Sequence, residues 1–487
     1  MLHAILIMAH KDAAHVYRIA KHFSMDCDVY VHFDRRNELD EADLTALHSL
    51  PQVKKVLRTH AVNWGGTSVL ECELNLLEVA VNNSNARYFH LISGQDYPIR
   101  SLNDFLKYFE DNDGIEFLQY THLPHKRWED NSYRRFEYYY PYDWAEGHEN
   151  PRRWVMERVR EQMRLGLKRP LPTEFDHLYG GSQWFSITRT AAETLLNYTH
   201  TQPSLYRRMW MTFAPEESYV ATVLLNLTDK ENVRSTNLRY IRWHYENGNR
   251  PANLGSEHFA DLVRCNCFFA RKFERGVSEK LLNSIDTYLL KDTSIKLMPC
   301  GGWDYDGVLS YGYDEAFSNF VLQFCQELGI TSAVDMGCGS GVYVSQWREF
   351  GLPFEGYDAN PHTARLSQLL MPQSQSVCGI YDLAGEETLG KTFELVVCKE
   401  VLPYIPRERM RMAAANLSRQ SSHFIILLWG RSEEVPCNDI AENEMIGMFS
   451  KDFEVENYMT ARLRVMLMRK DCCVLIRKGK QILDGLA

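Results

Sequence analysis

The sequence predicts an α/β protein made of two domains, at residues 1–290 and 297–487. Short apolar segments alternate with amphipathic ones from the first residues onward, which is typical of a mostly parallel sheet covered by helices. A short strand and a glycine-rich turn at residues 333–341, far from the start of the chain, indicate a second domain. At 487 residues and 45% apolar composition, the chain is long enough to fill two or three cores.

The pattern of the first half predicts a sheet that binds ligands at the carboxyl ends of its strands. Strands are expected at 2–8, 28–34, 53–58 and 87–93, with helices at 13–23, 40–49 and 67–82 between them. The ends of these elements carry His10, Asp34, Trp64-Gly65-Gly66 and Gly94-Gln95-Asp96. One polar residue in such a place is more often a turn or helix cap. Four of them in one layer indicate a nucleotide site.

The turn AVDMGCGSG follows a short buried strand that ends in Asp335. Glycines at 337, 339 and 341 let the backbone turn from a strand into a helix and leave amide N–H groups pointed at a ligand. The dinucleotide fingerprint requires its third glycine at position 342, where this chain has Val342. The pattern therefore favours a nucleotide cofactor without a pyrophosphate.

Three later strand ends extend this pattern. Asp358 in FEGYDANP is placed to accept hydrogen bonds from a ribose diol, Asp382 follows in CGIYDL, and FELVVCKEVLPYIP leads into Glu400 and Tyr404. From about Leu297 to the C-terminus this order resembles the class I S-adenosylmethionine-dependent methyltransferases. The resemblance implies a Rossmann-like domain that binds S-adenosylmethionine through Asp335, Gly337, Gly339, Gly341, Asp358, Asp382 and Glu400.

The end of this domain is expected to complete the sheet. A strand is predicted at 423–430, and the segments near 464–478 are interpreted as a terminal antiparallel pair. No catalytic base for methyl transfer stands out, since alignment and deprotonation can suffice for that reaction.

The first half also resembles a known family. The segments that carry the resemblance, in order, are VHFDRR, VNWGGTSVL, LISGQDYPIRS, GGSQWFSITR, APEESYVATVL, NLRYIRW and FFARKFE. They match the core-2/I-branching N-acetylglucosaminyltransferase and peptide O-xylosyltransferase family, glycosyltransferase family 14, over about residues 1–290. The resemblance implies a GT-A-like fold that transfers a sugar, xylose or N-acetylglucosamine, from a UDP donor to an acceptor hydroxyl with inversion and without a metal.

Inverting transfer in one displacement needs a general base for the acceptor hydroxyl. Glu217, in the sequence Pro215-Glu216-Glu217-Ser218, matches the base position of the family, and Glu216 is the second choice. The competing interpretation is that both acids only favour the positive end of a helix.

The charge that develops on the leaving UDP also needs a partner. Three Asp-x-Asp triplets, at 26–28, 111–113 and 304–306, are poorly placed for a metal. Arg271 and Lys272 match the diphosphate clamp of the family and can replace an ion, with Arg239 and Arg242 as weaker candidates. The nucleotide-sugar site is expected to include His10, Asp34, Trp64, Gly65, Asp96, Arg239, Arg271 and Lys272.

The acceptor side is less defined. Gln183 and Trp184 are the acceptor-binding candidates, and Gln183 stands where peptide xylosyltransferases carry an acid. A glycan or a lipid-linked saccharide is therefore expected in place of a peptide. An aromatic segment at 134–144 precedes a basic helix at 151–170, whose apolar stripe of Val155, Val159 and Met163 either packs on its own domain or meets a membrane surface.

Charge and cysteine usage limit the environment. A net charge of -10 argues against a nucleic-acid partner. The chain has no 18-residue apolar run, and its twelve cysteines lack metal-type spacing, so they are expected to be reduced and largely buried, as at Cys325, Cys398 and Cys473. We expect a bacterial cytoplasmic protein. A further expectation is that residues 151–170 contact the inner face of the membrane peripherally.

Two segments join the halves. Residues 290–294 are polar, and 300–314 are rich in glycine and aromatic residues. Glycines at 301, 302 and 307 suit either a lid over the cofactor or an ordinary linker.

The leading hypothesis is a bifunctional glycan-building enzyme that adds a sugar and methylates a sugar hydroxyl, with both reactions on the same growing polysaccharide as a further expectation. In the alternative, the methyltransferase carries a non-catalytic glycan-binding module; the presence of Glu217, Arg271 and Lys272 together speaks against it. A methyltransferase acting on nucleic acid is disfavoured by the acidic balance and by the absence of an NPPY-type motif after the fourth strand.

Overall fold

The computed structural model describes residues 2–125, 133–290, 313–371, 377–428, 440–449, 454–459 and 464–469. The chain divides into two compact units. The first comprises Met1–Leu254 and Asn266–Val277, and the second comprises Gly255–Cys265 and Ser278–Ala487. The boundary expected between residues 290 and 297 stays a prediction, since most of that segment lies outside the described residues.

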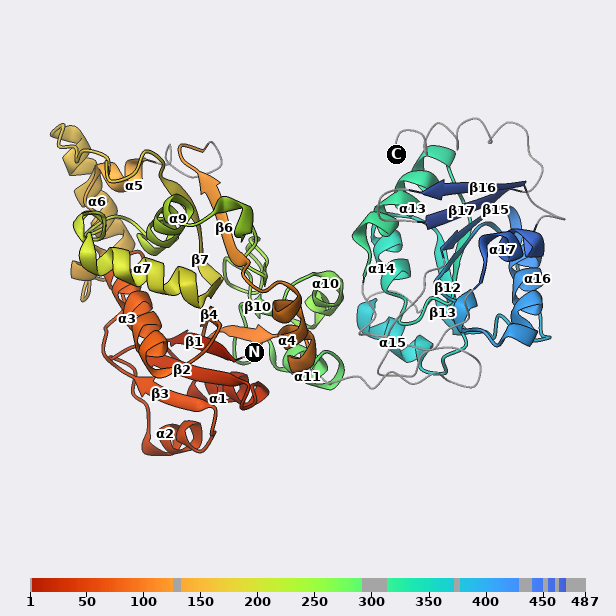
Figure 1. Ribbon diagram of the computed structural model, residues 1–487, viewed down its shortest axis with the longest axis horizontal. Helices are drawn as coiled ribbons and strands as arrows, with labels where there is room; N and C mark the ends of the chain where they lie inside the picture. Colours follow the sequence, from red (N-terminus) through yellow and green to blue (C-terminus); the bar gives the residue numbers. More distant parts are fainter. Residues whose placement is uncertain are drawn as a thin grey trace. The chain divides into compact units, whose positions relative to one another are not determined.

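The main sheet of the first unit has the strand order β3-β2-β1-β4-β7-β6-β8 (Figure 1). Its strands are β1 (His3–Ala9), β2 (Cys27–Phe33), β3 (Val53–Leu57), β4 (Tyr88–Ser93), β6 (Glu116–His122), β7 (Tyr179–Thr188) and β8 (Val233–Arg234). β1 pairs in parallel with β2 on one side and with β4 on the other, whereas β7 runs antiparallel to β4 and β6. The first four strands are all parallel, as the alternating pattern predicts.

Helices cover both faces of this sheet because each has an apolar side. They are α1 (Ala13–His22), α2 (Glu41–His48), α3 (Thr67–Asn83), α4 (Leu102–Asp111), α7 (Arg189–Thr201), α8 (Ser204–Arg208) and α9 (Glu216–Leu227). α3, α7 and α9 pack together against the sheet (Figure 1). Their buried side chains, with those of β1, β4 and β7, form the main core of the unit.

A small second sheet completes the site edge, with the order β5-β10-β9. Its strands are β5 (Asp96–Pro98), β9 (Arg239–Ile241) and β10 (Phe269–Arg271). The antiparallel register of β5 and β10 places Asp96 opposite Arg271. Two segments far apart in the sequence thus bring an acid and a base together.

The aromatic segment is part of the first unit. It contains α5 (Arg134–Glu137) and the 3-10 helix η2 (Tyr142–Trp144), and α6 (Pro151–Arg164) follows. Val155 and Val159 are buried against the aromatic segment, with Met163 packed on the same cluster. The apolar stripe therefore packs within its own unit, and the helix ends at Arg164, six residues before the predicted end.

The second unit has a sheet of order β13-β12-β11-β14-β15-β17-β16. Its strands are β11 (Ala333–Met336), β12 (Phe354–Asp358), β13 (Cys378–Ile380), β14 (Phe393–Lys399), β15 (Ser421–Leu428), β16 (Glu454–Met459) and β17 (Arg464–Arg469). β17 is antiparallel to β15 and β16, and the remaining neighbours are parallel. The terminal antiparallel pair was expected near 464–478, whereas among the described residues it lies at 454–469.

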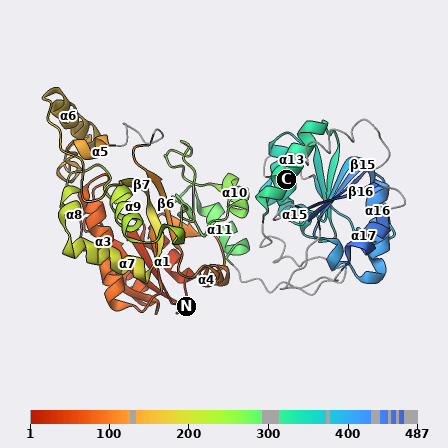
Figure 2. The same cartoon turned by 45° about the horizontal axis from the view of Figure 1, so that its top comes forward.

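The second unit has helices on both faces of its sheet and others that pack against helices. They are α10 (Phe259–Arg264), α11 (Glu279–Tyr288), α13 (Glu315–Leu328), α14 (Val342–Glu349), α15 (Thr363–Leu370), α16 (Met410–Gln420) and α17 (Glu442–Phe449). Figure 2 shows α13 and α15 on one side of the strands and α16 and α17 on the other. Short 3-10 helices complete the two units: η3 (Lys230–Asn232), η4 (Ser256–His258), η5 (Leu402–Tyr404) and η6 (Arg407–Arg409).

Within these described residues, no helix combines the length and apolar character that a membrane crossing requires.

Candidate functional site

The site in the first unit lies at the carboxyl ends of the adjacent strands β1 and β4, where the strand order of the sheet changes direction. In open α/β sheets a crevice forms outside the carboxyl ends of strands at such a switch point. His10 directly follows β1, Asp34 directly follows β2, and Asp96 comes three residues after β4. The structure therefore brings these three predicted residues to one edge of the sheet.

Arg271 is the buried cation of this edge. Its Nε lies 3.4 Å from Oδ1 of Asp96, and its guanidinium stacks 4.2 Å from the centre of the Trp184 ring. Burial lowers the pKa of Arg271, and burial also raises the pKa of Asp96. The pair thus holds a positive group inside the protein, next to an aromatic residue of β7.

Lys272 is the second cation, and it is only half-buried. Burial and the charges of Arg271 and Lys11 lower its pKa, which identifies a crowded positive environment. Burial and the neighbouring ammonium groups of Lys11 and Lys272 lower the pKa of His10 as well. Such a cluster of cations is suited to bind an anion such as a diphosphate.

The carboxylate of Asp34 is already saturated. Arg36 donates to it through its backbone N (2.8 Å), Nε (2.9 Å) and Nη2 (2.7 Å), and the backbone N of Val62 donates at 2.9 Å. Burial acts in the opposite direction, but these bonds lower the pKa of Asp34 to about 2. A carboxylate has about four acceptor sites, so Asp34 acts here by fixing Arg36 and the loop at Val62.

Arg239 corrects one expectation. Its Nη1 donates to Ser186 (2.9 Å) and its Nη2 to the carbonyls of Leu91 (2.9 Å) and Phe185 (2.7 Å). Burial lowers its pKa to about 9. Arg239 therefore ties β9 to β4 and β7 and is not an exposed cation for a phosphate.

The other weak candidate, Arg242, forms a two-pronged pair with Glu246, in which both N–O distances are 2.8 Å. Its charge is compensated within the same loop.

Trp64 and Gly65 begin the loop in front of α3. Gly65 has a φ of +78°, and a Cβ added there would lie 2.9 Å from the Phe213 ring and 3.1 Å from that of Tyr142. Only glycine fits both the backbone and the contact. The close approach leaves the ring of Trp64 edge-on to Phe213 and Tyr142, with its outer face in solvent.

Glu217 stands in the first turn of α9, where the helix dipole favours a carboxylate. Its Oε2 lies 3.1 Å from Nη1 of Arg135 in α5. About a third of the Glu217 side chain is exposed, against 12% of Arg135. The arrangement offers an oriented carboxylate that a ligand can reach.

Glu216 is different, although it is the next residue. It is buried, and burial together with the charge of Glu217 raises its pKa. Burial and the charge of Glu216 raise the pKa of Glu73 in α3, whose Oε2 lies 3.4 Å from Nε2 of Gln183. Gln183 thus contacts the buried acid Glu73. Glu216 is a poor choice for an accessible base because it is buried.

The described Asp-x-Asp triplets are engaged elsewhere. Asp28 lies 3.4 Å from Lys54 and Asp113 lies 2.8 Å from Arg87, while residues 304–306 lie outside the described part of the chain. His32, His60 and Cys72 bring ligand atoms within 4.8 Å of one another. The backbone N of His60, however, donates to Nε2 of His32 at 3.1 Å, which occupies one of these nitrogens.

In the second unit, the glycine turn follows β11 as predicted. Gly337, Gly339 and Gly341 all have positive φ, at 84°, 55° and 78°. The turn leads directly into α14. Asp335 is the third of four residues in β11, one position before the strand ends, and is buried.

Asp358 ends β12 and lies beside this turn. Its Oδ2 accepts the backbone N–H of Gly339 at 2.9 Å, and its Oδ1 accepts that of Asn360 at 2.8 Å. Two of the four acceptor sites of this carboxylate remain for a ligand. Burial raises the pKa of Asp358, so an added donor would compensate a real desolvation cost.

The carboxyl end of β14 carries a pair of opposite charges. Nζ of Lys399 lies 2.5 Å from Oε2 of Glu400, and the same ammonium lies 5.7 Å from the centre of the Tyr343 ring. Burial raises the pKa of Glu400 to about 6 and lowers that of Lys399 to about 8. Glu400 has a φ of +55°, an uncommon conformation for a residue with a side chain.

Asp382 lies two residues beyond β13 and is partly exposed. Its Oδ2 lies 2.5 Å from Nη2 of Arg409, and its Oδ1 accepts the backbone N–H of Ala384 at 3.0 Å. The structure thus gives Asp382 one partner within its own loop, Ala384, and one in η6, Arg409. Tyr404 is buried in η5.

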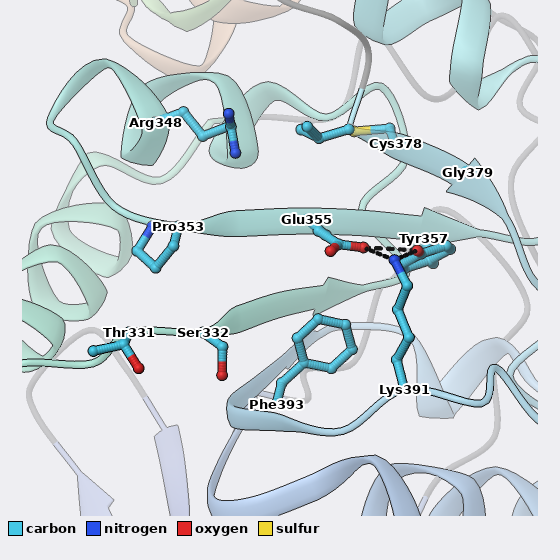
Figure 3. Close-up of a pocket in the computed structure, with 11 residues that line it drawn as sticks. Thr331, Ser332, Arg348, Pro353, Glu355, Tyr357, Cys378, Gly379, Lys391 and Phe393 are labelled. Atoms are coloured by element: carbon cyan, nitrogen blue, oxygen red, sulfur yellow. Dashed lines mark hydrogen bonds and ion pairs between the residues drawn. The ribbon is translucent and has the colours of Figure 1, made fainter.

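A cavity of about 610 Å³ lies beside β12, β13 and the start of β14. Thr331, Ser332 and Pro353 in its wall precede β11 and β12, and Lys391 and Phe393 mark the start of β14. Figure 3 shows Glu355 and Tyr357 of β12 directed at Lys391, with Glu355 2.7 Å from its Nζ. The wall also includes Tyr357, the residue before Asp358, and Cys378, whose Sγ would lie 2.9 Å from a Cβ added at Gly341.

Comparison with known proteins identifies the first unit. The family model described as "Branch: Core-2/I-Branching enzyme" matches residues 4–263, more than half of the chain. The chain belongs to the Core-2/I-Branching enzyme family. This confirms the family inferred from the motifs and the GT-A-like α/β class of the N-terminal domain.

Curated relatives match parts of the chain. It is 25% identical to Beta-glucuronosyltransferase GlcAT14B of Arabidopsis thaliana over 327 residues, which cover 64% of this chain and 68% of the relative. It is 28% identical to Xylosyltransferase 2 of Homo sapiens over 282 residues, which cover 53% of this chain and 30% of the relative. The chain spans under a third of the length of that xylosyltransferase.

Solved methyltransferase structures are also similar to part of the chain. One is magnesium protoporphyrin IX methyltransferase from Synechocystis PCC 6803 with bound SAM, with a TM-score of 0.28 and 18% identity over 32% of this chain and 78% of that chain. Another is the sugar N-methyltransferase KedS8 from Streptoalloteichus, with a TM-score of 0.31 and 12% identity over 38% of this chain and 98% of that chain.

Sequence reasoning missed two residues, Arg135 in the first unit and Lys399 in the second. Arg135 lies in the aromatic segment, where its charge gave no hint that it pairs with a residue 82 positions later. Lys399 precedes Glu400 at the end of an apolar strand, which is an unusual place for a lysine and was a readable signal. The lid expected at 300–314 falls almost wholly outside the described residues.

Proposed function

We propose that this Core-2/I-Branching family member is a bifunctional glycan-building enzyme. The first unit transfers a sugar from a UDP donor to an acceptor hydroxyl with inversion, and the second methylates a hydroxyl, on a sugar, with S-adenosylmethionine. The observation that carries the first activity is the accessible Glu217 carboxylate, oriented by Arg135 at the start of α9, in a unit that also gathers Arg271 and Lys272.

The residues support a single displacement. Glu217 accepts the proton of the acceptor hydroxyl, whose oxygen forms a bond to the anomeric carbon of the donor sugar. The bond between that carbon and the UDP oxygen breaks on the opposite side, and UDP leaves with the electron pair. One carboxylate suffices, because the configuration at the carbon inverts in one step.

Charge on the leaving diphosphate is balanced by cations of β10 and the residue after it. Arg271 is fixed by Asp96 and by the Trp184 ring, so its position costs no reorganisation during the reaction. Lys272 is half-buried beside it. These groups support transfer without a metal ion, and His10 stands next to them.

S-adenosylmethionine is proposed to bind at the carboxyl ends of β11 and β12, where the glycine turn and Asp358 lie. When bound, this cofactor supplies an electrophilic methyl group. Asp358 has two acceptor sites left for a ribose diol, and the three positive-φ glycines let the backbone approach the ligand closely. Glu400, with a pKa near 6, is placed to accept the proton of the methylated hydroxyl.

The donor is proposed by chemical class. The relatives compared above are named as a xylosyltransferase and a glucuronosyltransferase, and the resemblance to the core-2/I-branching N-acetylglucosaminyltransferases implies N-acetylglucosamine. UDP-xylose, UDP-glucuronic acid and UDP-N-acetylglucosamine are therefore the candidates. The proposed acceptor is a glycan or a lipid-linked saccharide in the cytoplasm.

Calorimetric titration of the full chain with these three UDP-sugars, followed by UDP release in the presence of oligosaccharide acceptors, tests the first activity. Titration with S-adenosylmethionine tests the second. Cofactor binding without binding of any UDP-sugar would favour the alternative, a methyltransferase with a glycan-binding module.

A further inference from the structure

Exposed aromatic side chains gather in the segments that precede α6 and α9. Tyr139 is 43% exposed, Trp144 62% and Trp210 47%. The Trp210 ring centre lies 5.9 Å from that of Trp144 and 6.2 Å from that of Tyr139, both in edge-on contact. We call these three residues the aromatic rim. Large aromatic rings left in water at one place mark a surface that binds something.

The backbone that carries the rim is held rigidly. Asp143, next to Trp144, accepts the backbone N–H of Thr67 at 2.7 Å and the hydroxyl of Ser68 at 2.5 Å. Gln162 of α6 accepts the backbone N–H of Tyr139 at 2.9 Å and donates to its carbonyl at 2.8 Å. A ligand therefore meets rings whose backbone is already ordered, which reduces the entropic cost of binding.

The loop that carries Trp210 is strained. Met211 has a φ of +54° and Ala214 a φ of +46°, and neither is a glycine. Residues persist in this conformation only where the surroundings fix them, and they cluster at ligand sites. Tyr140 contributes to this fixing, since its backbone N–H donates to the carbonyl of Met211 at 2.8 Å.

The same loop connects the rim to the candidate base. Phe213 lies edge-on to Trp64 at 5.6 Å, and the guanidinium of Arg135 lies 5.6 Å from the centre of its ring. Arg135 in turn pairs with Glu217. Trp210 is three residues before Phe213 in this loop, and Phe213 and Arg135 link the loop to the carboxylate at which the acceptor hydroxyl reacts.

We propose that Tyr139, Trp144 and Trp210 bind sugar rings of a saccharide acceptor, beyond the residue that receives the new sugar. The inference rests on the proposed function, because Glu217 marks the reacting end of the acceptor. An aromatic face packs on the apolar C–H face of a pyranose ring while the hydroxyls of the sugar stay hydrated. The guanidinium of Arg169 lies 4.4 Å from the centre of the Tyr139 ring and covers one of its faces. The edge-on arrangement keeps the faces of the Trp144 and Trp210 rings separate for successive sugars.

A membrane is the less favoured occupant. The apolar stripe of α6 that would have entered a bilayer is buried, with Val155 and Val159 inside the aromatic cluster. The rim itself consists of amphipathic rings and contains no aliphatic residue.

The test uses the full chain and β-linked cellohexaose, xylohexaose and chitohexaose, with their monosaccharides for comparison. Tryptophan fluorescence and calorimetry should show millimolar or tighter binding of at least one hexasaccharide and weaker binding of its monosaccharide. Trp144→Ala and Trp210→Ala should each weaken the hexasaccharide about three- to tenfold, the scale of one aromatic contact. Phe350→Ala is the matched control, because Phe350 is a 57% exposed aromatic residue of the second unit.

Three results would overturn the proposal. The first is no response to any hexasaccharide at millimolar concentration, and the second is wild-type affinity in both tryptophan variants. The third is that the tryptophan substitutions abolish sedimentation with phosphatidylglycerol vesicles, or dimer formation, and leave saccharide binding unchanged. Glu217→Gln separates this proposal from the proposed function, because the variant should lose transfer but still bind the hexasaccharide at the rim. If hexasaccharides bind to the rim but no UDP-sugar is used, the transferase assignment fails and the rim stands.

Discussion

The carboxylate of Glu217 lies 3.1 Å from the guanidinium of Arg135, a residue that is far away in the sequence and almost buried. The guanidinium also lies 3.4 Å from the carbonyl oxygen of Ala214 and over the ring of Phe213. Three contacts therefore fix the cation that orients the candidate base. Glu217 remains partly exposed, so it combines a fixed direction with access to a ligand.

Glu217→Gln should leave UDP-sugar binding nearly unchanged and reduce transfer about 100-fold or more, because an amide has nearly the same shape but does not accept the proton. Initial rates of UDP release with a saccharide acceptor, together with calorimetric donor titration, measure the two effects. Glu231→Gln is the control, since Glu231 is an exposed acid of the same unit. Wild-type turnover in the Gln variant would remove Glu217 as the base.

Arg135→Gln should lower kcat about tenfold and leave the donor affinity unchanged, since Arg135 positions the base and is not assigned to the donor. Arg135→Lys keeps a cation and should recover part of the rate. A variant with wild-type kcat, or a lysine variant no better than the glutamine one, would show that the pair is not needed for catalysis. Far-UV circular dichroism checks that the fold is retained.

Sugar transfer should survive excess EDTA. One carboxylate of each described Asp-x-Asp triplet is paired with a cation, Asp28 with Lys54 and Asp113 with Arg87. Arg271 and Lys272 supply positive charge at the expected diphosphate position. The measurement compares initial rates in chelator, with and without added manganese. Loss of activity that manganese restores would replace the cation clamp with a metal mechanism.

The alternation of apolar segments was enough to predict the parallel strands and their carboxyl-end residues, because local pattern and chain direction determine both. What those residues do there depends on tertiary contacts. Arg239 has the sequence context of a phosphate ligand, yet its guanidinium binds backbone carbonyls of β4 and β7. The acceptor sites of the Asp34 carboxylate are likewise occupied, in large part by Arg36, two residues away.

The second unit shows the same limit. The spacing of glycines predicted the turn and the partner role of Asp358 beside it. The positive φ of Glu400 and its contact with Lys399 come from the way β14 meets β15, where the backbone N–H of Glu400 donates to the carbonyl of Leu428. No local pattern in the sequence encodes that contact.

Asp335→Asn should change how stability depends on pH. Burial and the charge of Asp358 raise the pKa of Asp335 from 3.8 to about 7. The folded state therefore holds a proton that the unfolded state releases, and stability is lost as pH rises from about 4 through 7. Each pKa unit corresponds to about 1.4 kcal/mol, so the effect is at most about 4 kcal/mol.

Thermal unfolding of both proteins between pH 4 and pH 9 measures this effect of Asp335. The difference in Tm, variant minus wild type, should increase with pH, since the amide carries no charge to desolvate. A difference that is flat or falls with pH would mean that Asp335 is ionised at no cost in the folded protein.

Asp358→Ala should weaken S-adenosylmethionine binding at least tenfold and leave UDP-sugar binding intact. Asp358 accepts two backbone N–H groups and has two acceptor sites left for a ribose diol. A hydrogen bond to a charged acceptor contributes about 1.5–3 kcal/mol, and about 1.4 kcal/mol is a factor of ten in affinity. Paired titration of both ligands into wild type, Asp358→Ala and the exposed control Glu386→Ala provides the measurement. Unchanged cofactor affinity would mean that the ribose contact is misassigned, whereas a parallel loss of UDP-sugar binding would mean that the two sites depend on each other.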